Sequence, residues 1–104
     1  MPTRLVWSEG ASDDLTQIYE FIARDSLHYA EMVVRALLDA PARLAEFPRS
    51  GRVVPELQRE DVREVLWKTY RIVYQLQGEE AAVLTVFRAS RLLPRLQLEG
   101  DVAE

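Results

Sequence analysis

Apolar and polar residues alternate over residues 63–91, and nowhere else in the chain for long enough to build a sheet. Within this stretch lie three runs that are rich in β-branched and aromatic residues and are separated by short polar turns. The runs are 62–67, 70–76 and 81–88. They predict three consecutive strands, and the tight connections between them predict an antiparallel meander.

The middle strand indicates two unlike sheet faces, because successive side chains in a strand point to opposite sides. One face carries Tyr70, Ile72, Tyr74 and Leu76, and the other carries Arg71, Val73 and Gln75. We expect the first face to be a core and the second to be mixed. A guanidinium is not buried without a partner, so we expect the arginines of this region at strand ends or on an uncovered face.

Before the meander, the pattern predicts a short strand and two helices. Residues 4–7 form a β-capable run that ends at Ser8, a good N-cap residue, and from Glu9 the apolar spacing is helical. A second helix is expected after Ser26, and the short connection predicts a helical hairpin. Pro41 lacks an N–H, so we expect a kink or a restart there. The two buried stripes are predicted to be Ala11, Leu15, Ile18, Tyr19 and Ile22, and then Ala30, Val33, Val34, Leu37, Leu44 and Phe47.

These elements predict an α+β fold of order β-α-α-β-β-β, in which a helical hairpin packs on a small antiparallel sheet of four strands. Residues 48–61 have turn formers at both ends and no clean period, which predicts a long surface loop. Its arginines, Arg49, Arg52 and Arg59, make it a candidate docking arm, and the alternative is a solvated connector. The apolar segment 92–98 is either a last piece packed on the sheet or an exposed strip that binds a partner.

Length and composition predict one soluble domain, residues 1–104, with a core over about 4–93 and a frayed end over 99–104. No apolar run approaches the roughly 20 residues that span a bilayer, and residues 1–4 lack the apolar region of a secretory signal. We therefore expect a cytoplasmic protein that does not bind membranes. The absence of cysteine excludes disulfides and thiol catalysis.

The net charge of −4 is unevenly distributed along the chain. Residues 1–48 hold 4 basic and 8 acidic side chains, residues 49–95 hold 9 and 6, and residues 96–104 hold 0 and 3. An acidic chain is a poor general binder of nucleic acid, because phosphate contacts supply most of the non-specific affinity. We therefore expect no direct sequence-specific binding of nucleic acid, although the basic middle region can still bind a partner locally.

Nothing in the sequence indicates a cofactor, a metal site or a histidine-dependent active site. His28 is the only histidine, and no further ligands or carboxylates are spaced to converge on it. Asp13 and Asp14 lie near a helix start, where the helix dipole favours carboxylates, and this structural role accounts for them better than a catalytic pair does.

The arginines in and beside the strands are the strongest functional signal. A guanidinium offers a bidentate fork for carboxylate or phosphate, but it does not deprotonate and so is a poor general base. Proton transfer would need another group, and the sheet offers only Tyr70, Tyr74 and Glu64. We predict no catalytic residue. The candidates for contacts with a target or a partner are Arg63, Trp67, Arg71, Arg88, Arg91, Leu92 and Leu93.

The residues that fill this order resemble the RelE/ParE superfamily of toxins from bacterial type II toxin–antitoxin systems, and more closely its ParE branch. The resemblance covers roughly residues 5–92. It rests on VWSEGASDDLTQIYEFI for the first strand and helix, FPRSGRVVPEL for the loop, REVLWKTYRIVYQL for the central hairpin and LTVFRASR for the last strand.

The resemblance implies a toxin that a cognate ParD-like antitoxin holds inactive in a hetero-oligomer, commonly by wrapping an extended segment over its helices and sheet. ParE-branch toxins are associated with poisoning of DNA gyrase, whereas the RelE branch cuts messenger RNA on the ribosome, using basic residues and often a C-terminal tyrosine. Arg71 matches an arginine of the RNA-cleaving members, and Arg91, or else Arg88, matches the one after the last strand. Residues 92–93 are leucines where that tyrosine is expected, and Lys68 is the one counterpart of the flanking lysines.

We therefore expect a ParE-like toxin that arrests growth by binding DNA gyrase or another protein target. The alternatives are a RelE-like ribosome-dependent mRNA endoribonuclease and a non-toxic domain that retains the fold. RNA cleavage needs a base, an acid and a strongly basic docking surface, which this chain supplies poorly. Binding needs anchors and complementary charge, and Arg, Trp and Tyr most often carry such interfaces.

Overall fold

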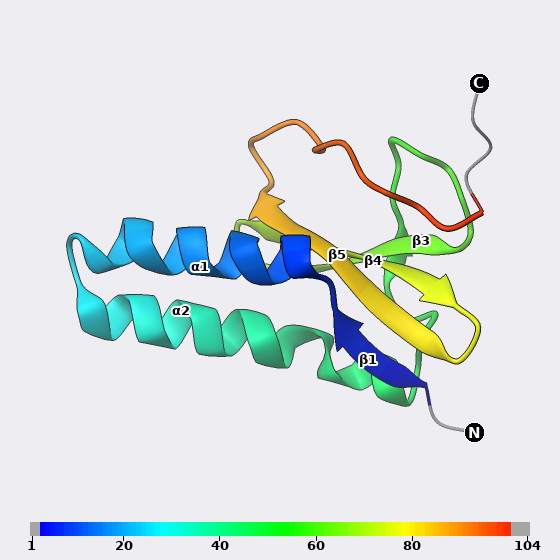
Figure 1. The fold of residues 1–104 in the computed structure, drawn as a ribbon, viewed down its shortest axis with the longest axis horizontal. Coiled ribbons are helices and arrows are strands. Elements are labelled where there is room, and N and C mark those ends of the chain that lie inside the picture. The colour runs from blue at the N-terminus through cyan, green and yellow to red at the C-terminus, as the bar shows by residue number, and fades with distance from the viewer. Residues whose placement is uncertain (1–2, 101–104) are drawn as a thin grey trace.

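The computed structural model describes residues 3–100 and shows two α-helices packed on a five-stranded sheet (Figure 1). In chain order the elements are β1 (Arg4–Trp7), α1 (Glu9–Ala23), α2 (Leu27–Asp39), the 3-10 helix η1 (Ala40–Ala45), β2 (Arg52–Val53), β3 (Val62–Trp67), β4 (Tyr70–Gln77) and β5 (Glu80–Arg88). The strands lie in the order β1-β5-β4-β3-β2. The predicted α+β class, the helical hairpin and the antiparallel meander are confirmed.

Two details of the sheet differ from the expectation. The sheet is mixed rather than wholly antiparallel, because β1 pairs in parallel with β5. A fifth strand, β2, lies inside residues 48–61, which we expected to be loop throughout. β2 has only two residues, Arg52 opposite Glu64 and Val53 opposite Arg63, and is too short to leave a period in the sequence.

Both helices begin at the predicted residues. The hydroxyl of Ser8 accepts a hydrogen bond from the N–H of Ala11 and thereby caps α1, and Ser26 caps α2 in the same way. The break predicted at Pro41 is confirmed, because α2 ends two residues earlier and η1 continues the chain. Phe47 is exposed rather than buried, since it lies beyond the end of η1, where the helical period no longer applies.

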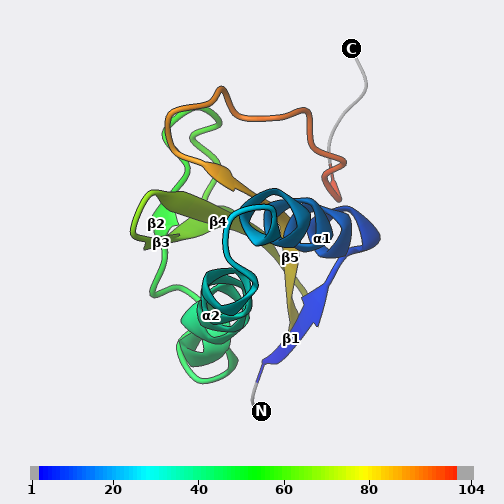
Figure 2. The same ribbon diagram turned by 90° about the vertical axis from the view of Figure 1, so that its left-hand side faces the viewer.

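The sheet separates two hydrophobic clusters, and Figure 2 shows the helical hairpin and the C-terminal segment on different sides of the strands. The larger cluster, between the sheet and the helices, is built around Leu15, Leu37, Leu44, Ile72 and Tyr74. The smaller cluster consists of Val54, Val62, Val73 and Phe87, with Leu57, Leu93, Leu96 and Leu98 packed against it. The second sheet face, which we expected to be uncovered, is therefore covered by the chain itself.

Most of the C-terminal segment 92–98, for which the sequence left two alternatives, packs on the sheet. Leu93, Leu96 and Leu98 pack on the sheet, whereas Leu92 is 93% exposed. The end predicted to be frayed begins at Glu99, and this residue is instead fastened to the sheet by two hydrogen bonds. Residues 101–104 lie outside the described residues.

The backbone of Ser8 and the side chain of Asp14 bind the part of β5 that lies beyond the end of β1. The N–H of Ser8 donates to the carbonyl of Val83 at 2.9 Å. The carboxylate of Asp14 accepts from the N–H of Val86 at 3.0 Å and from the hydroxyl of Thr85 at 2.7 Å. Asp14 therefore has a structural role, and its partner is a strand backbone in addition to the helix dipole.

Within residues 3–100, no helix combines the length and the apolar character needed to cross a bilayer.

Tyr74 fastens the segment before β2 to the sheet. Its ring is fully buried, and its hydroxyl donates to the carbonyl of Pro48 at 2.7 Å and accepts from the N–H of Gly51 at 3.1 Å. A Cβ at Gly51 would lie 2.6 Å from that hydroxyl oxygen, so the close approach requires glycine.

We predict that Tyr74→Phe lowers the free energy of unfolding by about 1–3 kcal/mol, because the Pro48 carbonyl and the Gly51 N–H both lose their partner. Urea denaturation monitored by circular dichroism measures this change. A midpoint equal to that of the wild type would show that water replaces the hydroxyl without loss.

Candidate partner-binding site

The structure divides the seven candidate residues between an exposed surface and the interior. The exposed or half-exposed group consists of Trp67, Arg88, Arg91 and Leu92. The group engaged within the molecule consists of Arg63, Arg71 and Leu93. The first group surrounds the turn between β3 and β4 and the end of β5, so the structure brings these four residues to one place.

This surface, here called the basic rim, is formed by Trp67, Lys68, Tyr70, Arg88, Arg91 and Leu92. The rings of Trp67 and Tyr70 lie with centroids 6.4 Å apart and planes inclined by 27°. Nζ of Lys68 lies 5.2 Å from the centre of the Trp67 ring, and Cζ of Arg88 lies 5.7 Å from the centre of the Tyr70 ring. Both distances are within the range of cation–π attraction, so each of the two rings has a cationic side chain over its face.

Backbone hydrogen bonds hold the two halves of the rim together. Lys68 has a left-handed backbone, with φ of 50°, and closes the tight turn with Thr69. The N–H of Ala89 donates to the carbonyl of Thr69 at 2.7 Å, and the N–H of Arg91 donates to the carbonyl of Arg88 at 3.0 Å. The turn after β5 is therefore fixed against the turn between β3 and β4.

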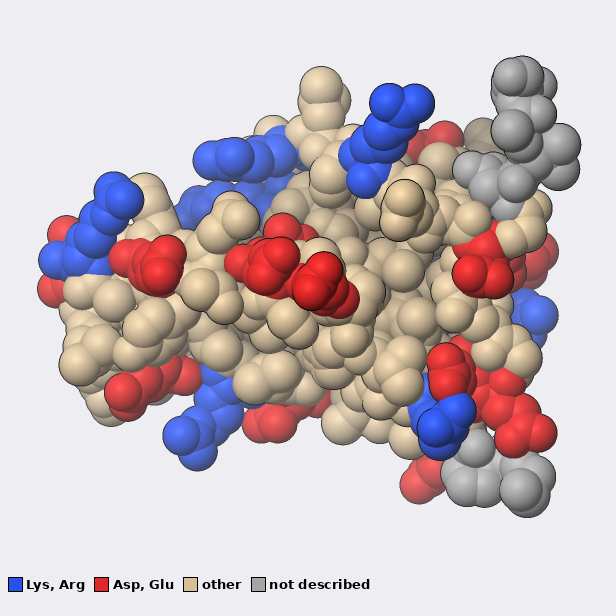
Figure 3. Space-filling model, in the orientation of Figure 1, with Lys and Arg blue, Asp and Glu red and all other residues tan. Residues whose placement is uncertain are grey.

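Basic and acidic side chains lie on different parts of the surface. Figure 3 shows Lys and Arg side chains gathered along the upper border of the view, around the end of β5 and the segment after it, while acidic side chains cross the front over α1. An exposed basic surface with aromatic rings beneath its cations is complementary to an acidic partner surface.

Arg71 is 7% exposed, and all three nitrogen atoms of its guanidinium donate hydrogen bonds within the chain. Its Nε donates to Glu64 at 2.6 Å, and its two Nη atoms donate to the two carboxylate oxygens of Glu56 at 2.7 Å each. Its Cζ lies 5.1 Å from the centre of the Phe87 ring. Glu64 is itself 1% exposed and also accepts a hydrogen bond from Nε of Arg52. The expectation that Arg71 emerges at a strand end or on an uncovered face is therefore wrong, because two carboxylates pair with it inside.

The pKa values of this network follow from its hydrogen bonds. The bidentate hydrogen bond from Arg71 lowers the pKa of Glu56 to about 2, and the two carboxylates raise the pKa of Arg71 above its usual value. Both groups therefore stay charged over the whole physiological range. The pairing ties residues 54–60 to the sheet through Glu56.

We predict that Glu56→Gln is less stable than the wild type by about 1 kcal/mol at pH 7, a figure discounted because the Glu56 side chain is 42% exposed. A carboxyl whose pKa falls from 4.5 to about 2 on folding stabilises the protein fully above pH 4.5, and loses this contribution as the pH falls toward 2. The difference between variant and wild type should therefore shrink when urea denaturation is repeated at pH 3. A difference that grows on acidification would contradict the assignment.

Arg63 likewise binds its own chain. Its Nη1 donates to the carbonyls of Gly51 and Arg49 at 2.9 and 3.2 Å, and its Nη2 pairs with Glu60 at 2.9 Å. The arginines of the predicted docking arm are held in a similar way, Arg49 by Glu60, Arg52 by Glu64 and Arg59 by Asp61. Residues 48–61 therefore form a segment fastened to the sheet.

The groups considered for proton transfer are largely used inside the fold. Glu64 lies between two guanidiniums, and the hydroxyl of Tyr74 donates to a carbonyl, while burial raises the pKa of Tyr74. Of these three groups only Tyr70 belongs to the rim, and its ring lies under Arg88. Among residues 3–100, no three acidic or histidine side chains are grouped closely enough to hold a metal ion.

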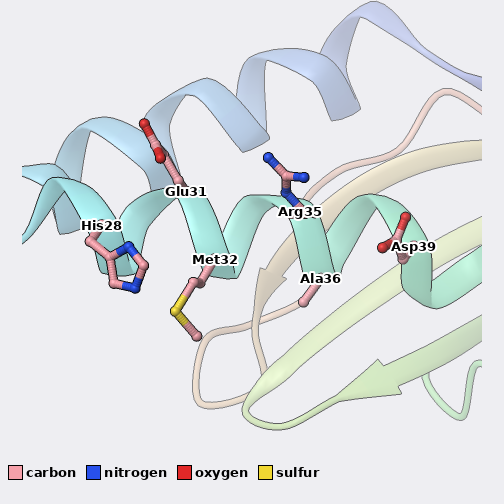
Figure 4. Close-up of a pocket in the computed structure, with 6 residues that line it drawn as sticks. All are labelled: His28, Glu31, Met32, Arg35, Ala36 and Asp39. Carbon is pink, nitrogen blue, oxygen red and sulfur yellow. The ribbon is translucent and has the colours of Figure 1, made fainter.

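The outer side of α2 carries a shallow hollow of about 370 Å³ that is separate from the rim. It is lined by His28, Glu31, Met32, Arg35, Ala36 and Asp39 (Figure 4). The imidazole of His28 points away from the carboxylate of Glu31, so the two do not form an acid–base pair. Charges of both signs alternate with apolar groups there, and no set of side chains converges on one point.

Sequence reasoning missed Lys68 as a rim residue and missed both carboxylates that neutralise Arg71. Lys68 is the only lysine of the chain and lies in a predicted turn beside Trp67, so a signal was present. Glu56 precedes Arg71 by 15 residues and belongs to a segment without a period, so no local pattern pairs the two.

Residues 5–93 match the family model described as ParE toxin of type II toxin–antitoxin system, parDE. No curated protein matches the chain in sequence. The chain is similar to one in the structure "Chromosomal ParDE TA system from P. aeruginosa", with a TM-score of 0.70 and 20% identity over 83% of this chain and 95% of that one. It is also similar to a chain of the toxin–antitoxin complex RelBE2 from Mycobacterium tuberculosis, with a TM-score of 0.62 and 18% identity over 85% of this chain and 99% of that one. At these identities the two structures show a shared fold.

Proposed function

Because the chain belongs to the ParE toxin family of type II toxin–antitoxin systems, we propose that it arrests growth by binding a protein target, DNA gyrase in the first place, through the basic rim. In this proposal the toxin breaks no bond in its target. A cognate ParD-like antitoxin neutralises it in a hetero-oligomer, and both encounters take place in the cytoplasm.

One observation carries the proposal: among the described residues, the cations of the rim form no ion pair with the chain itself. Lys68 and Arg88 lie over aromatic rings, and within residues 3–100 no acidic side chain pairs with Arg91. The arginines elsewhere along β2, β3 and β4 are instead bound by carboxylates, as Arg52, Arg63 and Arg71 are. Unpaired cations on a fixed backbone are available to an acidic partner without the loss of an internal contact.

The state of Arg71 supports binding over RNA cleavage. A phosphate at this position would have to displace Glu56 and approach Glu64, a buried carboxylate whose charge repels it. The rim itself offers arginine, lysine, tryptophan, tyrosine and leucine, and its groups capable of proton transfer are Nζ of Lys68 and the hydroxyl of Tyr70. This composition suits recognition better than general acid–base catalysis.

An antitoxin partner is supported by the apolar residues exposed on the helical hairpin. Phe21, Leu27, Met32 and Leu38 are each at least 44% exposed, and all lie on α1 or α2. Apolar side chains exposed on two adjacent helices are typical of a protein contact. Both structural neighbours come from structures described as toxin–antitoxin systems.

Expression of the chain from an inducible promoter tests the proposal, with the product of the neighbouring gene supplied from a second promoter. We expect growth arrest, rescue by the neighbour, and loss of supercoiling when purified gyrase is incubated with the toxin. If gyrase keeps its activity and ribosome-bound messages are cut instead, the chain acts as a RelE-like endoribonuclease. Normal growth at high expression, with no partner recovered, would indicate a domain that retains the fold without toxicity.

A further inference from the structure

Residues 92–99, here called the strap, cross the second face of the sheet without forming a helix or a strand (Figure 2, orange to red). Three of its leucines, Leu93, Leu96 and Leu98, pack on the smaller hydrophobic cluster. Within residues 3–100, no hydrogen bond involves the backbone of residues 92–98. Between its two ends, the strap is therefore held by apolar contact alone.

A buried side chain, Gln75 of β4, binds the far end of the strap through two hydrogen bonds. The N–H of Glu99 donates to Oε1 of Gln75 at 2.9 Å, and the carbonyl of Glu99 accepts from Nε2 of Gln75 at 2.8 Å. Gln75 is 1% exposed, and its carboxamide binds both backbone groups of one residue, as a neighbouring strand would. Nη2 of Arg59 donates to the same Glu99 carbonyl at 3.0 Å.

Asp61 fixes the orientation of this carboxamide. Its Oδ2 accepts from Nε2 of Gln75 at 2.8 Å and from Nη2 of Arg59 at 2.9 Å. A carboxylate only accepts, so the amide nitrogen of Gln75 must face Asp61, and the amide oxygen accepts from the N–H of Glu99 and from Nε2 of Gln77. The arrangement has one register, because a shift of the strap by one residue would remove both hydrogen bonds at once.

The near end of the strap is part of the basic rim. Arg91 and Leu92 lie between the last turn of the meander and the first buried leucine, Leu93. Pro94 restricts the backbone of Leu93 to extended conformations, so the strap leaves the rim in a fixed direction. We propose that Gln75 is a positioning residue, which latches the strap at Glu99 and thereby holds Arg91 and Leu92 in place for the target. This inference rests on the function proposed for the rim.

Limited trypsin digestion tests the latch without reference to function. The bond after Arg95, in the middle of the strap, is cut when the strap leaves the sheet. Gln75→Ala should raise the rate of this cut about tenfold, because two hydrogen bonds that exist only in the closed state are lost. The matched control is Gln97→Ala, which removes the same side chain from an exposed position on the strap and should leave the rate unchanged.

A second variant covers the case in which Gln75→Ala fails to fold. Leu96→Ala loosens the strap from its apolar side and leaves the sheet residues intact, so it should also raise the cleavage rate. Thermal unfolding reports separately on the folding of each variant. A Gln75→Ala protein that is folded and cut no faster than the wild type would overturn the latch, as would a Leu96→Ala protein cut at the wild-type rate.

A double-variant comparison tests positioning against a merely structural role. Gln75→Ala and Arg91→Ala should each weaken binding to gyrase about tenfold, and the double variant should bind no more weakly than the weaker single variant, because both act on the same contact. If the double variant loses affinity by the product of the two single losses, the positioning role is overturned. If the wild type itself does not bind gyrase, the proposed function fails, and so does the positioning of Arg91 for that target, while the latch is still decided by the digestion.

Discussion

Exchange of Glu64 for alanine should lower the free energy of unfolding by about 3–5 kcal/mol, because it leaves Nε of a buried guanidinium without a partner. Glu64 is 1% exposed and accepts hydrogen bonds from Arg71 on one side and Arg52 on the other. Arg52 can turn to water, since more than half of its side chain is exposed, but the side chain of Arg71 is 9% exposed and cannot. The loss therefore falls mainly on the desolvated Nε of Arg71.

Chemical denaturation of three variants separates this cause from a general loss of charge. Glu60→Ala removes a carboxylate that is 79% exposed and pairs with Arg63, and should cost less than about 1 kcal/mol. Simultaneous exchange of Glu64 for leucine and Arg71 for methionine should recover most of the loss, because apolar residues of similar volume can replace a buried pair. A Glu64→Ala protein within about 1 kcal/mol of the wild type would mean that water enters and solvates Arg71.

The same network bears on function, because it decides what the second sheet face can bind. Glu56 and Glu64 accept hydrogen bonds from all three side-chain nitrogen atoms of Arg71, and the ring of Phe87 lies against its guanidinium. An arginine in this state ties the segment after β2 to the sheet. Of the unpaired cations, Arg88 lies opposite Tyr70, one residue before Arg71 in β4, and successive side chains of a strand point to opposite faces of the sheet. The chain thus separates arginines that stabilise the fold from arginines that are available to a partner.

The elements that could be predicted are those set by local physics. The meander follows from the alternation of apolar and polar residues with a period of two. The short turns between its strands are enough to set the register of pairing. The helix starts follow from Ser8 and Ser26, whose hydroxyl groups accept from the backbone three residues on. The break at Pro41 follows from a missing N–H. Each of these rules acts within a few residues, so a single sequence carries it.

The parts that could not be predicted depend on contacts between distant residues. Arg71 is buried because Glu56 and Glu64 reach it, and a rule that keeps unpaired guanidiniums exposed gave the wrong place for it as long as those partners were unknown. The strap has no period, and the side chain of β4 that binds its far end, Gln75, is 24 residues away from Glu99 in the sequence. The rim was predicted only in part for the same reason. Its arginines differ from those along β2, β3 and β4 in having no acidic partner within residues 3–100, and such partners come from distant parts of the sequence.

Replacement of Arg88 and Arg91 together by alanine should abolish growth arrest, with binding to gyrase weakened at least about thirtyfold. Both side chains are exposed and lack an ionic partner within the described residues, so their full charge is available to the target. Truncation removes two cations and the contact of Arg88 with Tyr70, but no buried hydrogen bond. The free energy of unfolding should therefore change by no more than about 0.5 kcal/mol per site.

The matched control is Arg35→Ala, which removes an equally exposed arginine from the outer side of α2, remote in the sequence from the rim (Figure 4). It should leave arrest and gyrase binding unchanged. Replacement of the two rim arginines by lysine should retain part of the affinity, since the charge remains while the planar fork is lost. Binding by the wild type should also weaken as salt is raised, and more steeply than binding by the alanine variant, because screening acts only on charges that are present. Undiminished arrest by the double alanine variant would move the target contact to another surface, and the exposed apolar face of the helical hairpin would then be the first to examine.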